Sequence, residues 1–232
     1  MGIIVGLDLL SGLFLIPDSF NAFRTSHYYC HHGLLPRQES MAAWGALVYP
    51  IHTNSMGLID SSARKLEQQS DKHRILVLGD SHSEGVGVPY EKTFAGRLAR
   101  KLAPHGMEVI NGSAVSYSQK IEYLKARFLL EKEGLEVDEI IVMIDISDLQ
   151  NELVYEAFEP REKGKLGDMI YRFRTKLKRI STITYLVDAL RTSRQQEEFY
   201  DSIDNFYADV RDNENNNCLL YTSPSPRDEL AD

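Results

Sequence analysis

The sequence predicts an α/β fold in which the strands of a parallel sheet alternate with helices. Three short runs rich in Val and Ile, 75–80 (ILVLGD), 108–114 (EVINGSA) and 139–145 (EIIVMID), have the composition of buried parallel strands. Apolar residues recur at helical spacing in 91–103 and in 118–133, between these runs. An order of strand, helix, strand, helix and strand implies right-handed crossover connections within one sheet.

The composition is that of a globular chain and excludes one class of partner. The 232 residues are 43% hydrophobic and 26% charged, and they suffice for one α/β domain with an appendage. The formal net charge of −8 argues against nucleic-acid binding, because phosphates require a basic surface. The two cysteines, Cys30 and Cys218, lie too far apart in the sequence to indicate a disulfide framework.

The region before the first predicted strand divides into two segments. In residues 1–17, the stretch Ile3–Ile16 is apolar except for Asp8, but it is shorter than the roughly 20 residues of a membrane-spanning helix. It fits the surviving end of a membrane anchor, a signal-peptide core or a buried helix. We favour the anchor, which would attach the protein to a membrane through its N-terminus. Residues 18–73 contain many Pro and Gly residues, so we expect an irregular extension laid against the domain.

The region after the α/β core, which we place at 74–150, is predicted to be helical. Within 151–217, amphipathic patterns at 161–180 and 197–214 carry opposite charge and would pair as a helical insertion. A sharper interpretation is a lid whose basic side meets an anionic glycan or lipid surface. Residues 218–232 begin with CLLYTSPSPRD, which resembles one reading frame of a sequencing adapter. We therefore expect an artefactual tail there.

Small polar residues follow each of the three predicted strands. The strands end in Gly79-Asp80-Ser81, in Asn111-Gly112-Ser113 and in Asp145-Ile146-Ser147-Asp148. Open parallel sheets place their sites beyond the carboxyl ends of the strands, so these groups should converge. A serine on a strand–helix turn exposes its hydroxyl and leaves its own N–H free for an oxyanion. The alternatives are a glycine-rich packing turn and an anion-binding loop, although the GxxxxGK[ST] pattern is absent.

The motif GDSHSEGVGV at 79–88 resembles the first block of the SGNH/GDSL hydrolases, a flavodoxin-like family of serine esterases and related acyl-transfer enzymes. The resemblance extends through 74–152, with 111–118 at the second block and 145–148 at the third. It implies an incomplete three-layer flavodoxin-like fold and an activity that needs neither a metal ion nor an organic cofactor.

The resemblance also implies roles for single residues. Ser81 would be the nucleophile, and Asp80 would shape its turn. Ser116 stands where the family has an oxyanion-hole glycine, and Ser147 where it has an asparagine that supplies a third donor. Asp148 would close the third block and orient its loop. Support of the loops would come from Gly79, Gly85 and Asn111.

One part of the family pattern is missing. The family's catalytic base lies in an Asp-x-x-His motif, and this spacing does not occur in the sequence. His82 adjoins Ser81, but neighbouring side chains on such a turn point apart, so we do not expect it to act as the base. We therefore expect this polypeptide to be inactive or nearly so, with the base encoded downstream.

The favoured function is hydrolysis of a carboxylic ester in a small molecule, a glycan or a lipid. We expect the protein to act in the cell envelope, with the cytoplasm as the alternative compartment. An O-acyltransferase would use the same site with a sugar hydroxyl in place of water. A catalytically silent envelope binding module and a receiver-like phosphoacceptor at Asp80 are rivals from other classes. A metal site at Cys30, His31 and His32 with His27 is disfavoured, because neighbouring positions rarely converge on one ion.

Overall fold

The computed structural model describes residues 7–8, 10–11, 23–162, 164, 166–167, 169–171, 173, 181–183, 186–187 and 190. By its internal contacts the chain divides into two compact units, 1–185 and 186–232. Residues 23–162 of the first unit carry the sheet and the candidate site. The helix expected at 197–214 and the tail expected at 218–232 lie outside the described residues, as do most of 1–17 and of 161–180.

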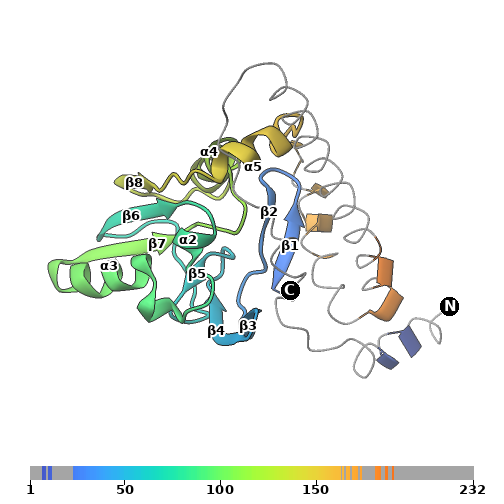
Figure 1. Ribbon diagram of the computed structural model, residues 1–232, viewed down its shortest axis with the longest axis horizontal. Coiled ribbons are helices and arrows are strands. Elements are labelled where there is room, and N and C mark those ends of the chain that lie inside the picture. Colours follow the sequence, from blue (N-terminus) through green and yellow to red (C-terminus); the bar gives the residue numbers. More distant parts are fainter. Residues whose placement is uncertain are drawn as a thin grey trace, which may run out of the picture. The chain divides into compact units, whose positions relative to one another are not determined.

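The three predicted strands form the parallel part of one sheet, as expected. They are β6 (His73–Leu78), β7 (Met107–Asn111) and β8 (Glu139–Val142), and β6 lies between the other two (Figure 1). The register places Leu76 opposite both Ile110 and Ile140. The strand β8 lies at the edge of the sheet, and its Ile140 and Val142 side chains are exposed.

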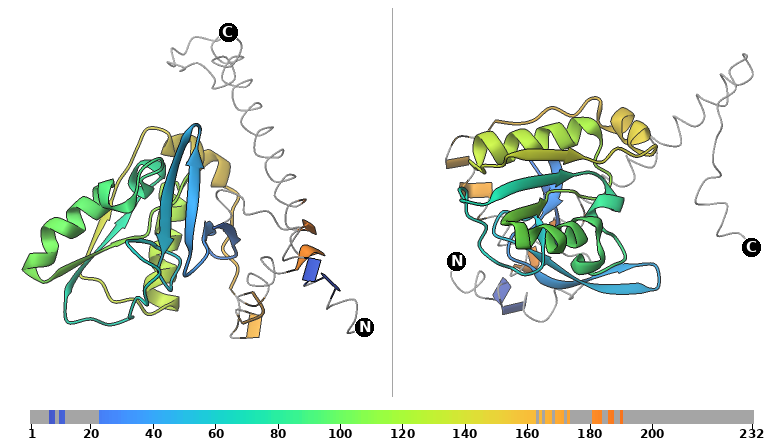
Figure 2. Two further views of the ribbon diagram at one scale, coloured as in Figure 1. Left: turned by 90° about the horizontal axis from the view of Figure 1, so that it is seen from below. Right: turned by 90° about the vertical axis from the view of Figure 1, so that its left-hand side faces the viewer.

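Helices cover both faces of these strands, which makes three layers (Figure 2, right-hand view). The helix α3 (Phe94–Leu102) packs through Ala95 on one face, against Val77 and Val109. The other face, which includes Leu76 and Ile110, packs against the segment after α4. This alternation follows from the two-residue period of a strand. The α/β class and the three-layer arrangement are therefore confirmed.

The short helices and turns complete this frame. They are α2 (Ser81–Glu84), η1 (Tyr90–Lys92), η2 (Ala103–His105), α4 (Gln119–Arg127), η3 (Phe128–Lys132) and α5 (Asp148–Tyr155). The helices expected at 91–103 and 118–133 are thus present. Among the described residues, no helix is both long enough and apolar enough to span a bilayer.

The segment 18–73 is more regular than the sequence suggests, and our prediction of an irregular extension is wrong. It contains the hairpin β1 (Arg24–His27) and β2 (His31–Leu34), and then β3 (Glu39–Trp44), β4 (Leu47–Thr53) and β5 (Ile59–Asp60). The last three extend the main sheet on the β7 side, all in antiparallel pairing. Of the glycines and prolines that suggested irregularity, Pro36, Gly45 and Gly57 lie between strands, whereas Gly33 lies within β2 and Pro50 within β4.

Candidate active site

The Ser81 hydroxyl lies where β6 ends and α2 begins. Asp80 caps this helix, because its Oδ1 accepts the His82 N–H at 2.9 Å. The Ser81 Oγ donates to Asp80 Oδ2 at 3.4 Å. Asp80 is buried, whereas Ser81 is partly exposed, so the turn is fixed from within and Ser81 lies at the surface.

At Gly79 and Gly85 of this turn, other side chains of the protein occupy the space that a Cβ atom would need. A Cβ atom at Gly79 would collide with the Ser83 side chain, and one at Gly85 would collide with Thr93. Gly85 also ends α2 with φ +85°, a conformation that side chains disfavour. These contacts explain Gly79 and Gly85 by packing, which is one of the alternatives that the sequence left open for this turn.

The other two strand ends lie against the Ser81 turn. In the second loop, the Ala114 N–H donates to the Gly79 carbonyl at 3.2 Å. In the third loop, the Asp145 Oδ2 lies 3.5 Å from the His82 Nδ1. The buried Asn111 braces the first turn, since its Nδ2 donates to the Ser83 carbonyl at 3.0 Å. The structure therefore brings together the three polar strand ends that the sequence singled out.

Ser116 occupies a backbone conformation that favours glycine, with φ +61°. Within the described chain, neither its N–H nor that of Ser81 donates to a protein acceptor. The first N–H groups of a helix have no partner inside that helix, which accounts for the free N–H of Ser81. Two free N–H groups on adjacent loops are what an oxyanion requires.

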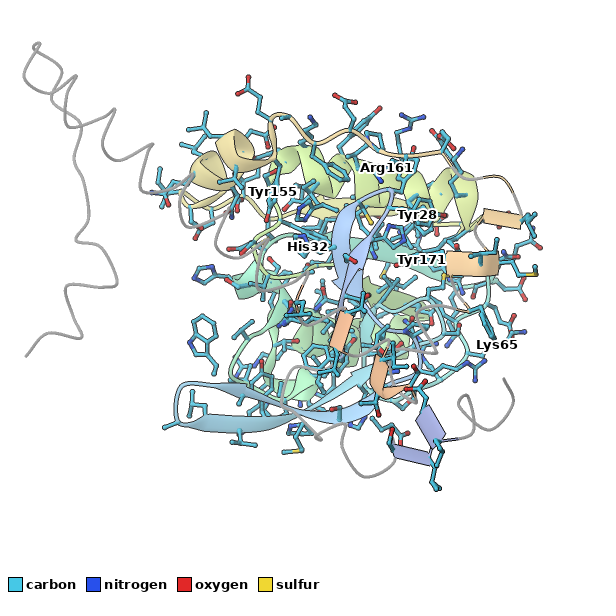
Figure 3. All side chains as sticks on the ribbon, turned by 90° about the vertical axis from the view of Figure 1, so that its right-hand side faces the viewer. Tyr28, His32, Lys65, Tyr155, Arg161 and Tyr171 are labelled. Carbon is cyan, nitrogen blue, oxygen red and sulfur yellow. The ribbon has the colours of Figure 1, made fainter. Side chains whose placement is uncertain are left out.

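His32, which the sequence analysis considered only as a disfavoured metal ligand, anchors the loop of Ser116. Its Nε2 donates to the Val115 carbonyl at 2.7 Å, and its own carbonyl accepts the Tyr117 hydroxyl at 2.9 Å. Burial lowers the pKa of His32 to about 3, with the neighbouring His31 as the next cause. The ring is therefore neutral, and its one proton is committed to Val115. His32 is part of β2, and Figure 3 labels it at the hairpin β1–β2.

A buried ion pair anchors the same loop from the other side. The Arg24 guanidinium pairs with both carboxylate oxygens of Glu84, at 2.9 Å and 2.5 Å. The Glu84 Oε2 also accepts the Val115 N–H at 2.7 Å. The Glu84 side chain is 2% exposed, so these donors, and not water, stabilise its negative charge. The hairpin β1–β2 thus fixes the Ser116 loop through both backbone polar groups of Val115.

The third loop holds Ser147 and Asp148 in different ways. The Asp145 Oδ1 accepts both the N–H and the hydroxyl of Ser147 at 2.6 Å, so this hydroxyl is engaged within its own loop. These bonds, the side-chain bond first, lower the pKa of Asp145. The fully buried Asp148 accepts the Asp145 N–H at 2.8 Å through Oδ2. Burial is the main cause that raises the pKa of Asp148, and the negative charges of Asp80 and Asp145 add to this rise.

Glu122 is a second residue that sequence reasoning missed. It lies on α4, is 2% exposed, and neither of its carboxylate oxygens has a hydrogen-bond partner. Burial, and then the negative charges of Asp148, Asp80 and Glu152, raise the pKa of Glu122 to about 8. Its carboxyl is therefore protonated at neutral pH. No local pattern distinguishes it from the other polar residues of α4.

His82 turns toward carboxylates. Its Nδ1 lies 3.2 Å from Asp80 Oδ2 and, as noted, near Asp145, and 75% of its side chain is exposed. The hydrogen bond to Asp80 is the main cause that raises the pKa of His82. The ligand atoms of Asp80, His82 and Asp145 lie within 4.8 Å of one another and could approach one cation. Their mutual contacts already satisfy these groups without an ion.

Comparisons with known proteins give distant structural likenesses. No family model matches the chain, and no curated protein matches it. Among solved structures, AlinE4, described as an SGNH-hydrolase family esterase, is 17% identical with a TM-score of 0.31, and two of its mutants are 15% and 16% identical with the same TM-score. Each match covers 70% of this chain and 92% of the other. At so low a TM-score, the function has to be argued from this chain's own site.

Proposed function

We propose that this chain is a serine hydrolase core that cleaves carboxylic esters through Ser81. One observation carries the proposal: Ser81 is partly exposed on a turn that the loop of Ser116 contacts, and among the described residues neither its N–H nor that of Ser116 has an acceptor. In this mechanism the Ser81 Oγ attacks the acyl carbon, and the two N–H groups bind the oxyanion of the tetrahedral intermediate. Collapse of the intermediate expels the alcohol and leaves an acyl group on Ser81, which water then hydrolyses.

The proton of Ser81 has one nearby acceptor in the described chain, Asp80 Oδ2 at 3.4 Å. A carboxylate is a weaker base than an imidazole, so acylation by an ordinary ester should be slow. An oxyanion hole and substrate binding alone still accelerate a reaction by roughly 10³–10⁴ over water. An activated ester should therefore acylate Ser81 measurably.

The test uses p-nitrophenyl acetate and measures released p-nitrophenol over time. We expect a burst whose amplitude matches the amount of protein, followed by slow turnover. Ser81→Ala should abolish the burst. Ser83→Ala is the matched control, because Ser83 lies in the same helix but is 3% exposed. A burst that survives in Ser81→Ala would refute the assignment of the nucleophile.

Two alternatives share this site. An O-acyltransferase would pass the acyl group to a glycan hydroxyl, so adding an acceptor glycan would produce acylated glycan where a hydrolase yields free acid. A silent binding module is favoured by the engagement of the Ser147 hydroxyl with Asp145, which removes a third oxyanion donor. Absence of the burst in the unmodified chain would support the silent module.

We further propose that the natural substrate is an ester of the cell envelope, a glycan or a lipid, and that the N-terminal segment attaches the protein to a membrane. The support is the apolar stretch Ile3–Ile16. Fractionation of cells that express the chain would test this: recovery in the membrane fraction supports it, and recovery in the cytosol contradicts it.

A further inference from the structure

The turn end of the hairpin β3–β4 lacks charged side chains on both of its faces, whereas Glu39 and His52 lie on the outer face at its base. Residues 41–51 read MAAWGALVYPI and include no acidic, basic or histidine side chain. Ala42, Tyr49 and Ile51 point into the core, as the alternation of a strand requires. The opposite face of an antiparallel hairpin is normally polar. Near the turn the opposite face carries Met41 and Val48, while Trp44 and Leu47 continue the core-side face beyond the core.

The exposed residues form what we call the apolar tip, which consists of Met41, Trp44, Leu47 and Val48 with the neighbouring Val88. Their exposed fractions are 43%, 60%, 57%, 53% and 37% respectively. Trp44 and Leu47 are paired at the turn, next to Gly45. In Figure 2 (right-hand view) and Figure 3, the hairpin extends away from the rest of the sheet. The apolar tip is thus a protrusion.

The apolar tip adjoins the candidate active site. A Cβ atom at Gly87 would lie 3.5 Å from Leu47 Cδ1, so the hairpin turn contacts the loop that follows α2. Val88 continues the apolar surface onto that loop. Leu47 of the apolar tip thus lies next to the loop that follows α2, the helix that begins at Ser81.

We propose that the apolar tip docks on a lipid bilayer with neutral headgroups, into which Trp44 and Leu47 insert. A protein interface normally has a polar rim and hydrogen bonds, and 41–51 offers no charged group for either. A bilayer demands only an apolar protrusion, and tryptophan is favoured at the depth of the headgroups. The net charge of −8 disfavours anionic lipids, which selects neutral ones.

The experiment exploits the fact that Trp44 is the only tryptophan of the chain, so its fluorescence reports the apolar tip alone. The full chain is titrated with phosphatidylcholine vesicles. We expect the emission to shift to shorter wavelength and to be quenched by brominated phosphatidylcholine. Raising the salt concentration should not weaken binding, because no ion pair is involved.

Leu47→Ser and Leu153→Ser form a matched pair of variants. Leu153 is 52% exposed, and it lies on α5, which follows β8 at the opposite edge of the sheet from β3. Leu47→Ser should lower the vesicle partition coefficient on the order of tenfold, because it removes a half-exposed leucine side chain from the lipid. Leu153→Ser should leave it unchanged. Circular dichroism establishes that both variants fold.

Three outcomes would overturn the proposal. The first is no spectral shift with phosphatidylcholine, and the second is an equal loss of binding in both variants. The third is a shift that appears without vesicles as the protein is concentrated, together with a doubled sedimentation mass, because a second copy would then cover the apolar tip. The readout does not use ester cleavage, so its failure would leave the proposed function standing.

Discussion

The substitution Glu122→Gln should stabilise the protein at neutral pH. The unfolded chain holds this carboxyl at its ordinary pKa of 4.5, whereas burial beside Asp148 and Asp80 raises the folded pKa to about 8. Between these two values the folded state binds one more proton than the unfolded state. Stability is therefore lost as the pH rises through this window, by about 1.4 kcal/mol per pH unit.

From pH 5 to pH 7.5 the raised pKa of Glu122 lowers the free energy of unfolding by about 3 kcal/mol. A glutamine has nearly the same shape and does not titrate, so the variant should lack this decline. The assay is urea unfolding followed by far-UV circular dichroism at several pH values. We expect the unmodified chain to lose about 3 kcal/mol more than Glu122→Gln over that interval.

Glu131→Gln is the control for this prediction. Glu131 undergoes the same chemical change but is exposed and pairs with Arg127 on the surface. Its removal should cost only about 0.5 kcal/mol. If Glu122→Gln and the unmodified chain show parallel pH dependence, Glu122 is ionised in the fold and the account of its burial is wrong.

Three further predictions concern the anchors of the Ser116 loop. As the pH falls from 7 to 5, the imidazole of His32 is protonated in the unfolded chain but stays neutral in the fold, so the unmodified chain should lose about 2 kcal/mol of folding free energy. His32→Gln should lack this loss. Urea unfolding that shows the same decline in both proteins would contradict the prediction. Arg24→Met should destabilise the fold by roughly 3 kcal/mol, since it leaves the Glu84 carboxylate buried with fewer donors, and a thermal melt equal to that of the unmodified chain would exclude this role. Ser116→Gly should leave stability unchanged within about 0.5 kcal/mol, because relief of the left-handed backbone offsets the entropy of glycine; a clear loss in denaturant would show that its side chain matters.

The strands and the meeting of their ends were predictable because both depend on local patterns. Val- and Ile-rich runs of this length are characteristic of buried parallel strands, and β6, β7 and β8 lie where the runs do. Once a parallel sheet is inferred, its topology requires the residues after Leu78, Asn111 and Val142 to gather at one edge. The α/β class and the position of the candidate site followed from this.

The supports of the site could not be predicted, because they depend on contacts between distant parts of the chain. His32 and Val115 are far apart in the sequence, and their bond exists only once β1–β2 packs against the second loop. Glu122 resembles any helix-surface residue until α5 covers it. The strands of 18–73 escaped detection because residues typical of turns lie within two of them, Gly33 in β2 and Pro50 in β4.

The most direct test of the account asks where an acyl group is found after the chain meets an activated ester. The protein is incubated with p-nitrophenyl acetate, quenched in acid, digested and analysed by mass spectrometry. The account predicts an acetyl group on the peptide that contains Ser81, assigned to Ser81 by fragmentation and absent from Ser81→Ala. Acetylation of lysines and the N-terminus alone, at the same level in both proteins, would contradict it.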